Sequence, residues 1–124
     1  MGLGSSLPCN VLIVEDEVMI SMLIHDMLHE QGCGIVGPVT SLDQALLLAT
    51  QSAIDVALLD INVGGSSIYP VADMLRSRNI PFVFYSGHDS NILPSRFQDT
   101  LMLRKPFSRQ DLVAKLDEAL GVER

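Results

Sequence analysis

The chain has 124 residues, 48% of them hydrophobic, and its 15 acidic and 8 basic residues give a formal net charge of −7. The length fits one domain, and the acidic balance argues against a nucleic-acid surface, which needs a basic stripe. No apolar run is long enough to span a membrane, and two cysteines, Cys9 and Cys33, are too few for a disulfide framework. We therefore expect a cytoplasmic protein, with a flexible leader over residues 1–8 and one domain over residues 9–124.

Short apolar segments alternate with segments of helical periodicity along the chain. Strands are predicted within 10–16, 34–39, 54–61, 80–87 and 100–107, and helices within 17–32, 40–52, 68–79 and 108–121. In the first helix, Ile20, Leu23, Ile24, Met27 and Leu28 recur at helical spacing. Residues 62–67 are predicted to form a loop, and 88–99 is ambiguous because Pro94 interrupts any helix there.

Polar residues mark several helix ends. Ser41, with Gln44 three residues later, predicts a capping box at the start of the second helix. Ser108 is predicted to cap the last helix, which Gly121 ends. The strands are apolar on both faces, as parallel strands covered by helices are. The alternation therefore predicts an α/β fold with a doubly wound parallel sheet of five strands.

Polar side chains gather at the carboxyl ends of these strands. Glu15 and Asp16 end the first strand, Asp60 and then Asn62 the third, Ser86 and Gly87 the fourth, and Lys105 the fifth. Ligands of open parallel sheets bind at this edge. Clustered carboxylates repel one another unless a cation joins them, and their hard oxygens suit Mg²⁺. Each of these residues alone could be a turn or a helix cap, but together they predict one site.

The chemistry predicted for this site is phosphoryl transfer. Asp60 could accept a phosphoryl group as an acyl phosphate, with a metal between Asp16, Asp60 and the phosphate. Ser86, the N–H of Gly87 and Lys105 would hold the phosphate oxygens. A metal site at His25 and His29, four residues apart, is the weaker interpretation of that pair, and a solvated helix face is the favoured one. His88 is interpreted first as a loop residue.

The motifs "LIVEDE", "LLDIN", "FVFYSGH" and "LRKPF" resemble, in order and spacing, the receiver domain of bacterial two-component response regulators. The resemblance runs from about Asn10 to Leu120. It implies the flavodoxin-like fold with strand order 2-1-3-4-5. It also implies Glu15 and Asp16 as the acidic metal-binding pair, Asp60 as phosphoacceptor and the carbonyl of Asn62 as a further ligand of Mg²⁺ (or Mn²⁺). Ser86 matches the switch hydroxyl and Lys105 the lysine that contacts the phosphate.

The chain departs from the common receiver pattern in three places. The segment "NVGGSSIYPVADML" follows Asp60 instead of the usual Met-Pro, and a short segment with Pro94 predicts a curtailed or irregular fourth helix. Met102 stands where many receivers have Tyr or Phe. These departures and the stretch "PFVFYSGHD" are similar to a subgroup of stand-alone receivers called the FAT GUY group.

The resemblance implies a single-domain response regulator that is not an enzyme toward separate substrates. A histidine kinase or phosphotransfer protein would phosphorylate Asp60, and the signal would pass by altered contacts to a downstream protein or by onward phosphotransfer. A monomer or weak homodimer is expected. The alternatives are a phosphate sink without output and a phosphatase of the haloacid-dehalogenase kind. Asn62 argues against the phosphatase, because that reaction requires a second carboxylate two residues after the nucleophile.

Overall fold

The computed structural model describes residues 9–87 and 93–121. It contains a parallel five-stranded sheet in the order β2-β1-β3-β6-β7, which is the predicted order 2-1-3-4-5 of the main strands. The strands are β1 (Asn10–Val14), β2 (Gly34–Val39), β3 (Val56–Asp60), β6 (Phe82–Ser86) and β7 (Met102–Arg104). The predicted doubly wound, flavodoxin-like α/β fold is therefore confirmed.

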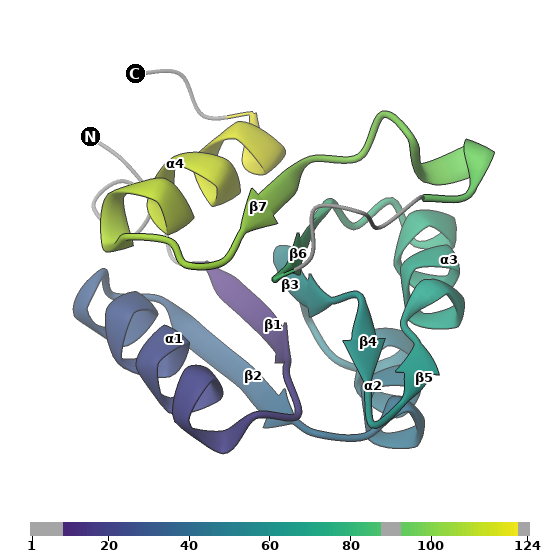
Figure 1. Ribbon diagram of the computed structural model, residues 1–124, viewed down its shortest axis with the longest axis horizontal. Coiled ribbons are helices and arrows are strands. Elements are labelled where there is room, and N and C mark those ends of the chain that lie inside the picture. Colours follow the sequence, from purple (N-terminus) through teal and green to yellow (C-terminus); the bar gives the residue numbers. More distant parts are fainter. Residues whose placement is uncertain (1–8, 88–92, 122–124) are drawn as a thin grey trace.

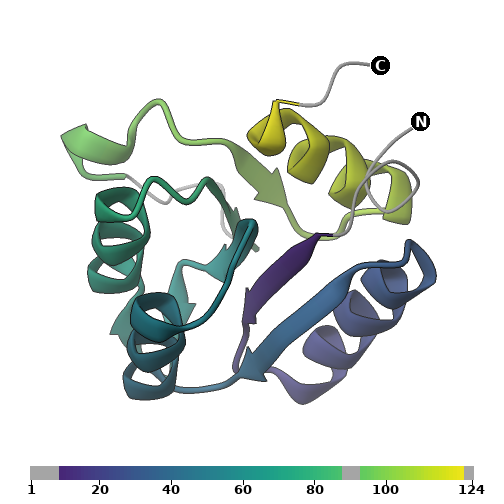
Figure 2. The same ribbon diagram turned by 180° about the vertical axis from the view of Figure 1, so that it is seen from behind.

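Helices cover both faces of this sheet, as Figures 1 and 2 show. One face carries α1 (Val18–Glu30) and α4 (Arg109–Leu120), and the other carries α2 (Leu42–Gln51) and α3 (Tyr69–Ser77). The central strands β3 and β6 are buried throughout because they have helices above and below. Residue alternation divides β6 between two cores: Phe82 and Phe84 face α2 and α3, and Val83 and Tyr85 face α1 and α4.

The predicted cap residues stand at their helix ends, but of the capping box predicted at Ser41 and Gln44 only one hydrogen bond is formed. Ser41 accepts a hydrogen bond from the N–H of Gln44 at 3.3 Å. Ser108 and Asp111 form a reciprocal capping box, and Gly121 ends α4 with a φ of 76°. Within α1, the predicted apolar stripe holds for Ile24 and Leu28, which are fully buried, but Leu23 is 52% exposed.

One segment differs from its prediction. Residues 62–67, predicted as a loop, form a small antiparallel hairpin of β4 (Asn62–Val63) and β5 (Ser66–Ser67). Gly64 and Gly65 join them with φ angles of 57° and 80°. Positive φ at both turn residues matches the right-handed twist of a two-residue hairpin, and glycine adopts it without steric cost. A local turn therefore orders this segment, which sequence periodicity alone does not indicate.

Between β6 and β7, the described residues 93–101 contain one turn of 3₁₀ helix, η1 (Ser95–Phe97), in agreement with the predicted irregular fourth helix. Phe97 fixes this turn. Its ring is fully buried and lies 5.5 Å from the ring centroids of both Tyr69 and Phe84, and the guanidinium of Arg76 lies 4.7 Å from it. The described part of this connection, residues 93–101, contains no α-helix, and the packing of Phe97 attaches it to the core instead.

We expect Phe97→Ala to lower the free energy of unfolding by about 3–5 kcal/mol, because it empties a fully buried aromatic site. Urea unfolding followed by circular dichroism measures this. Leu93→Ala is the matched control, since Leu93 is half-buried against the same core, and its loss should cost less. Equal costs for the two variants would contradict the anchoring role of Phe97.

Candidate functional site

The carboxyl ends of the strands surround a pocket of about 260 Å³. It is lined by Asp16, Glu17, Asp60, Asn62, Ser86, Gly87 and Lys105. The parallel register makes this convergence necessary, because Val14 pairs with Leu59, Asp60 with Tyr85, and Ser86 with Arg104. Every residue predicted for the site except Glu15 lines the pocket. Glu15 lies beneath it, with no exposed surface.

Carboxylates dominate this pocket. Glu15, Asp16 and Asp60 each offer an oxygen, and these oxygens lie within 4.8 Å of one another. Asp60 and Glu15 are buried, whereas Asp16 is exposed and faces incoming solvent. Like charges this close repel strongly in a low-dielectric environment unless a cation compensates them. The cluster therefore has the donor set of a hard divalent cation, with one exposed ligand through which the ion could enter.

Lys105 supplies compensation from within the chain. Its Nζ lies 3.2 Å from Glu15 Oε1, 3.4 Å from Asp60 Oδ2 and 3.7 Å from Glu17 Oε1. The side chain is 17% exposed, so these ion pairs are partly shielded from water. Asp60 and Glu15 together raise the pKa of Lys105 against the lowering effect of burial. Lys105 therefore stays charged and offsets part of the negative charge of the cluster.

Tyr85 is a part of the site that we did not predict. Its hydroxyl donates to Glu15 Oε1 at 2.7 Å, and Lys105 Nζ lies 4.8 Å from its ring centroid. Burial and the adjacent Glu15 raise the pKa of Tyr85, so it remains a neutral donor. A buried tyrosine hydroxyl usually has a hydrogen-bond partner, so the presence of Tyr85 in an apolar strand could have indicated a polar neighbour.

The carboxylate of Glu15 is accordingly satisfied on both oxygens. Oε1 receives Tyr85 and Lys105, and Oε2 accepts the N–H of Glu17 at 3.0 Å. This arrangement compensates the charge of a side chain that has no contact with solvent. Glu17, which follows the predicted acidic pair, is the second neighbour that sequence reasoning omitted.

The environment of Asp60 favours its protonated form. Burial, followed by the adjacent Glu15, raises its pKa to about 7, against the lowering effects of Lys105 and the N–H of Asn62. That N–H donates to Asp60 Oδ1 at 3.3 Å. A carboxylate at a buried strand end thus gains neither full solvation nor full pairing from the protein alone, and a bound cation would favour its ionised form.

The β4–β5 hairpin contacts the site through its backbone. The N–H of Gly64 donates to Asp16 Oδ2 at 2.9 Å, which ties the turn to the exposed carboxylate of the cluster. The predicted phosphate-binding pair lies across the pocket. Ser86 is 5% exposed, its carbonyl accepts the N–H of Lys105 at 2.9 Å, and Gly87 follows it at the pocket wall.

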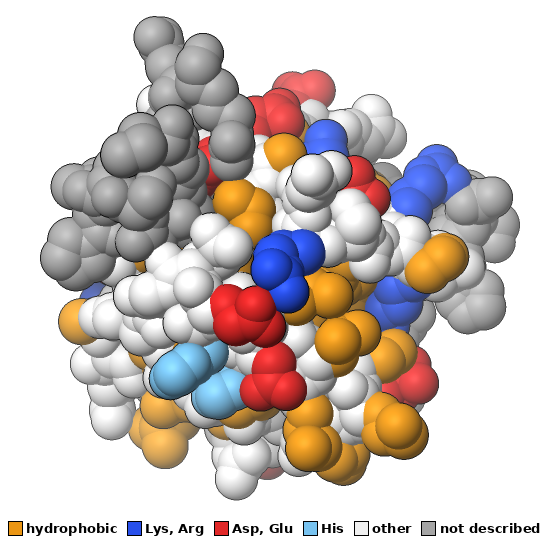
Figure 3. All heavy atoms as spheres, turned by 90° about the vertical axis from the view of Figure 1, so that its left-hand side faces the viewer, with side chains coloured by type: hydrophobic (Ala, Val, Ile, Leu, Met, Phe, Trp, Pro, Cys, Tyr) orange, Lys and Arg blue, Asp and Glu red, His pale blue; other side chains and the backbone are white. Residues whose placement is uncertain are grey.

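Other candidate groups lie elsewhere. His25 and His29 stack on the outer side of α1 with ring centroids 5.9 Å apart, and histidine side chains are visible on that surface in Figure 3. Among the described residues, Glu15, Asp16 and Asp60 form a cluster of three potential metal ligands, and His25 and His29 are not part of it. His88 lies outside the described residues.

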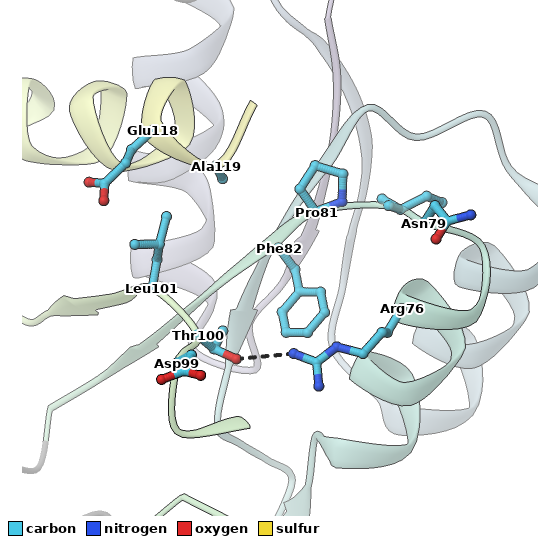
Figure 4. A pocket seen from close by; sticks show the side chains of 10 residues that line it. Arg76, Asn79, Pro81, Phe82, Asp99, Thr100, Leu101, Glu118 and Ala119 are labelled. Atoms are coloured by element: carbon cyan, nitrogen blue, oxygen red, sulfur yellow. Dashed lines mark hydrogen bonds between the residues drawn. The ribbon is translucent and has the colours of Figure 1, made fainter. Parts of the chain in front are cut away.

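A second pocket, of about 450 Å³, lies at the amino ends of β6 and β7 (Figure 4). Its lining includes Pro81, Phe82 and Leu101, and Arg76 crosses it to donate to Thr100 Oγ1 at 3.4 Å. This pocket contains none of the predicted site residues, and it lies at the opposite sheet edge from the carboxylates. This pocket is therefore not the phosphoryl-transfer site, although it is the larger of the two.

The model of the response regulator receiver domain family matches residues 11–117. The chain belongs to this family. The match covers both acidic strand ends, the hairpin and the Lys105 loop, so the whole pocket is part of the receiver. Haloacid-dehalogenase-like phosphatase activity, the enzymatic alternative, is not supported, because the chain is a receiver and carries Asn62 in place of a second carboxylate.

Relatives of this receiver come from several bacteria. The transcriptional regulatory protein PdtaR of Mycobacterium tuberculosis is 31% identical over 121 residues, which are 94% of this chain and 59% of PdtaR. This chain thus spans about three fifths of the curated relatives that it matches.

Solved structures show the same fold. SdrG from Sphingomonas melonis Fr1 is 40% identical with a TM-score of 0.81, over 93% of this chain and 98% of SdrG. A BeF₃-activated conformation of SdrG is 37% identical with a TM-score of 0.76, over 96% and 98% of the two chains. PhyR from Bartonella quintana, described as an anti-anti-sigma factor, is 26% identical with a TM-score of 0.78, over 96% and 51% of the two chains.

Within residues 9–87 and 93–121, no helix of this receiver combines the length and the apolar character that crossing a bilayer requires.

We expect Asp60→Asn to stabilise the metal-free receiver above pH 7. The pKa of Asp60 is about 7 in the folded protein and 3.8 in the unfolded reference, so ionisation destabilises the folded state as pH rises between these values. The asparagine cannot ionise. This shift corresponds to at most about 4 kcal/mol, and the partner lost by Lys105 reduces the gain to about 1–3 kcal/mol.

Urea unfolding in the presence of a chelator, at pH 8 and pH 5, measures this gain. The advantage of Asp60→Asn should be largest at pH 8 and shrink toward pH 5 and below, where the wild-type carboxyl is protonated in the folded protein. Asp99→Asn, an exposed aspartate away from the site, is the control. A variant less stable than wild type at pH 8 would contradict the repulsive environment of Asp60.

Proposed function

We propose that this receiver accepts a phosphoryl group on Asp60 from a histidine kinase or a histidine phosphotransfer protein. The observation that carries the proposal is the position of the Asp60 carboxylate, at the wall of an open pocket and 3.4 Å from Lys105 Nζ. The BeF₃-activated conformation of the similar SdrG supports it, since fluoroberyllate is a phosphoryl analogue. In the transfer, a bond forms from an Asp60 oxygen to phosphorus, and the bond from phosphorus to the donor imidazole nitrogen breaks.

The chain's own groups would position the phosphoryl oxygens. Lys105 already contacts Asp60, and Ser86 and Gly87 line the same pocket beside Lys105. Charge-assisted bonds from these donors would stabilise the oxygens as negative charge moves into the pocket. We assign Ser86, Gly87 and Lys105 to phosphate binding on this basis.

Glu15, Asp16, Asp60 and the backbone carbonyl of Asn62 are the proposed metal-binding groups, for Mg²⁺ or Mn²⁺. Bound there, the cation would neutralise charge shared by the carboxylates and the phosphoryl oxygens. The exposed Asp16 and the buried Asp60 fit direct contacts, because their oxygens face the pocket. Glu15 fits an outer position, since Tyr85, Lys105 and Glu17 already use its oxygens.

The conformational readout is proposed to involve the hairpin and the segment after Ser86. Met102 is half-buried against the core beside Phe84, its strand partner, and carries no aromatic ring that could swing as in common receivers. The negative charge of a phosphoryl group on Asp60 would instead attract Ser86 and Lys105. It would also alter the hydrogen bond between Gly64 and Asp16. The loops that line the pocket therefore carry the change to the surface.

The amino-terminal half of α1 is the proposed docking surface for the phosphodonor. Val18, Met19, Met22 and Leu23 are 62%, 84%, 60% and 52% exposed, and they adjoin an apolar pocket lined by Ile20, Pro106 and Phe107 beside Lys105. Figure 3 shows hydrophobic side chains gathered on this side of the molecule. An apolar patch at the rim of the site would seat a helical donor with its histidine over Asp60.

We further propose that this receiver is a cytoplasmic, stand-alone response regulator of the FAT GUY subgroup. The motif around Tyr85–Gly87, the 3₁₀ turn in the described part of the fourth connection and the match over 98% of SdrG support this. The similarity to PhyR supports a downstream protein target in sigma-factor control, reached by altered protein–protein contacts. Onward phosphotransfer and a role as phosphate sink are the alternative outputs.

We expect acetyl phosphate with Mg²⁺ to add one phosphoryl group to the wild-type protein, and Asp60→Asn to abolish the addition. Intact-mass spectrometry at neutral pH measures it. Asp99→Asn, which preserves the pocket, should be phosphorylated like wild type. A mass gain that persists in Asp60→Asn would show that the acceptor is another residue.

If the phosphodonor protein docks on α1, a substitution there should slow transfer from that protein but not from acetyl phosphate. Leu23→Glu should slow transfer from the kinase or phosphotransfer protein about tenfold or more, because it places a charge in an apolar contact. Labelling by acetyl phosphate, which needs no docking, should remain unchanged. Leu47→Glu is the matched control, since Leu47 is 54% exposed on α2 at the opposite face.

Phosphotransfer profiling against the purified kinases and phosphotransfer proteins of the source organism measures this difference. Equal slowing by Leu23→Glu and Leu47→Glu would contradict docking on α1.

A further inference from the structure

Cys9 and Cys33 lie at the amino ends of β1 and β2, at the end of the sheet opposite the phosphorylation site. Asn10 and Gly34 are strand partners, and the N–H of Gly34 donates to the carbonyl of Cys9 at 2.7 Å. Cys9 and Cys33 are therefore the preceding pair in the same parallel register, with both side chains on the α1 and α4 face of the sheet. Both side chains belong to the same buried cluster, and each thiol shifts the pKa of the other.

The two strands are joined at this point, because the N–H of Gly34 donates to the carbonyl of Cys9 just before the paired residues Asn10 and Gly34. Neighbouring strands lie about 4.8 Å apart, which is within the range of about 4.4–6.8 Å that a disulfide requires between Cα atoms. Both cysteines also lie outside the regular ladder, just before β1 and β2, where the backbone can adjust.

We propose that Cys9 and Cys33 are a modification site that forms a reversible intramolecular disulfide on exposure to a peroxide. The bond would close a loop that contains all of β1 and α1. It would leave the carboxylate pocket intact, because Cys9 and Cys33 lie at the amino ends of β1 and β2, whereas the pocket lies at the carboxyl ends of the strands.

The two thiols have different roles in this reaction. The neighbouring Cys9 thiol lowers the pKa of Cys33, against the raising effects of burial and of the Asp117 carboxylate, and the same contact raises the pKa of Cys9. Cys33 also precedes the edge strand β2 and is flanked by exposed Gly32 and Gly34. Cys33 is therefore the thiolate that attacks, and Cys9 is the resolving thiol.

The chemistry balances with hydrogen peroxide as the oxidant. The Cys33 thiolate attacks one peroxide oxygen, the O–O bond breaks, and a sulfenic acid forms as hydroxide leaves. The Cys9 sulfur then attacks the Cys33 sulfur, the S–O bond breaks, and water leaves. Two thiols lose two electrons and two protons in total, and one peroxide becomes two waters. Exposures of 4% for Cys9 and 6% for Cys33 make the first step slow and limit it to small oxidants.

Treating the whole protein with hydrogen peroxide, then unfolding it and adding N-ethylmaleimide, tests the proposal. We expect an intact mass lower by two hydrogens, no maleimide adduct, and a peptide linked through Cys9 and Cys33 in a non-reducing digest. Dithiothreitol should restore two alkylatable thiols. Two thiols that stay free while glutathione in the same tube is oxidised would overturn the proposal, as would sulfinic acid or an intermolecular disulfide as the main product.

Two variants separate the roles of the thiols. Cys9→Ser should accumulate a sulfenic acid on Cys33 that dimedone traps, whereas Cys33→Ser should leave Cys9 alkylatable under the same peroxide treatment. The reverse pattern would overturn the assigned order of attack. The non-reducing digest of wild type needs neither variant, so the site remains testable if a variant fails to fold. None of these readouts involves phosphorylation, and a failure here is distinct from a failure of the proposed function.

Discussion

The ammonium of Lys105 lies between the carboxylates of Glu15, Glu17 and Asp60, and the rest of the pocket depends on this arrangement. Two of these acids are buried at strand ends, where neither water nor a helix compensates their charge. Lys105 offsets part of this charge, but one ammonium cannot neutralise the whole cluster. The remaining negative charge is what makes the pocket receptive to a divalent cation and, through it, to a phosphoryl group.

Tyr85 and the β4–β5 hairpin adapt this arrangement in this particular receiver. The Tyr85 hydroxyl holds Glu15 beneath the pocket, and its ring supports Lys105. The hairpin holds Asp16 from the solvent side through the N–H of Gly64. The acidic pair is thus held from opposite directions, one member by a buried phenol and the other by a turn. A ligand that binds Oδ2 of Asp16 must compete with the N–H of Gly64 for this oxygen. Ligand binding in the pocket would therefore affect the position of the exposed hairpin turn.

The two edges of the sheet carry different chemistry. The carboxyl ends of the strands gather charge, while the amino ends bring Cys9 and Cys33 together in the core on the α1 and α4 face of the sheet. Strand β1 connects them, because it begins after Cys9 and ends before Glu15. Parallel topology produces this separation: every strand contributes its last residues to one edge and its first residues to the other, so the protein can hold two kinds of reactive group without mixing them.

Much of this receiver follows from its sequence alone. Apolar runs that end in Glu15–Asp16, Asp60, Ser86 and Lys105 indicate parallel strands and one polar edge, because strand direction and residue spacing are local properties. Caps such as Ser108 are local as well. Three features needed the tertiary structure: the contact of Tyr85 with Glu15, the ordering of Gly64 and Gly65 as a hairpin, and the meeting of Cys9 with Cys33. Each joins segments distant in sequence or depends on φ angles, and only the packed sheet determines which side chains and backbone groups then come within reach.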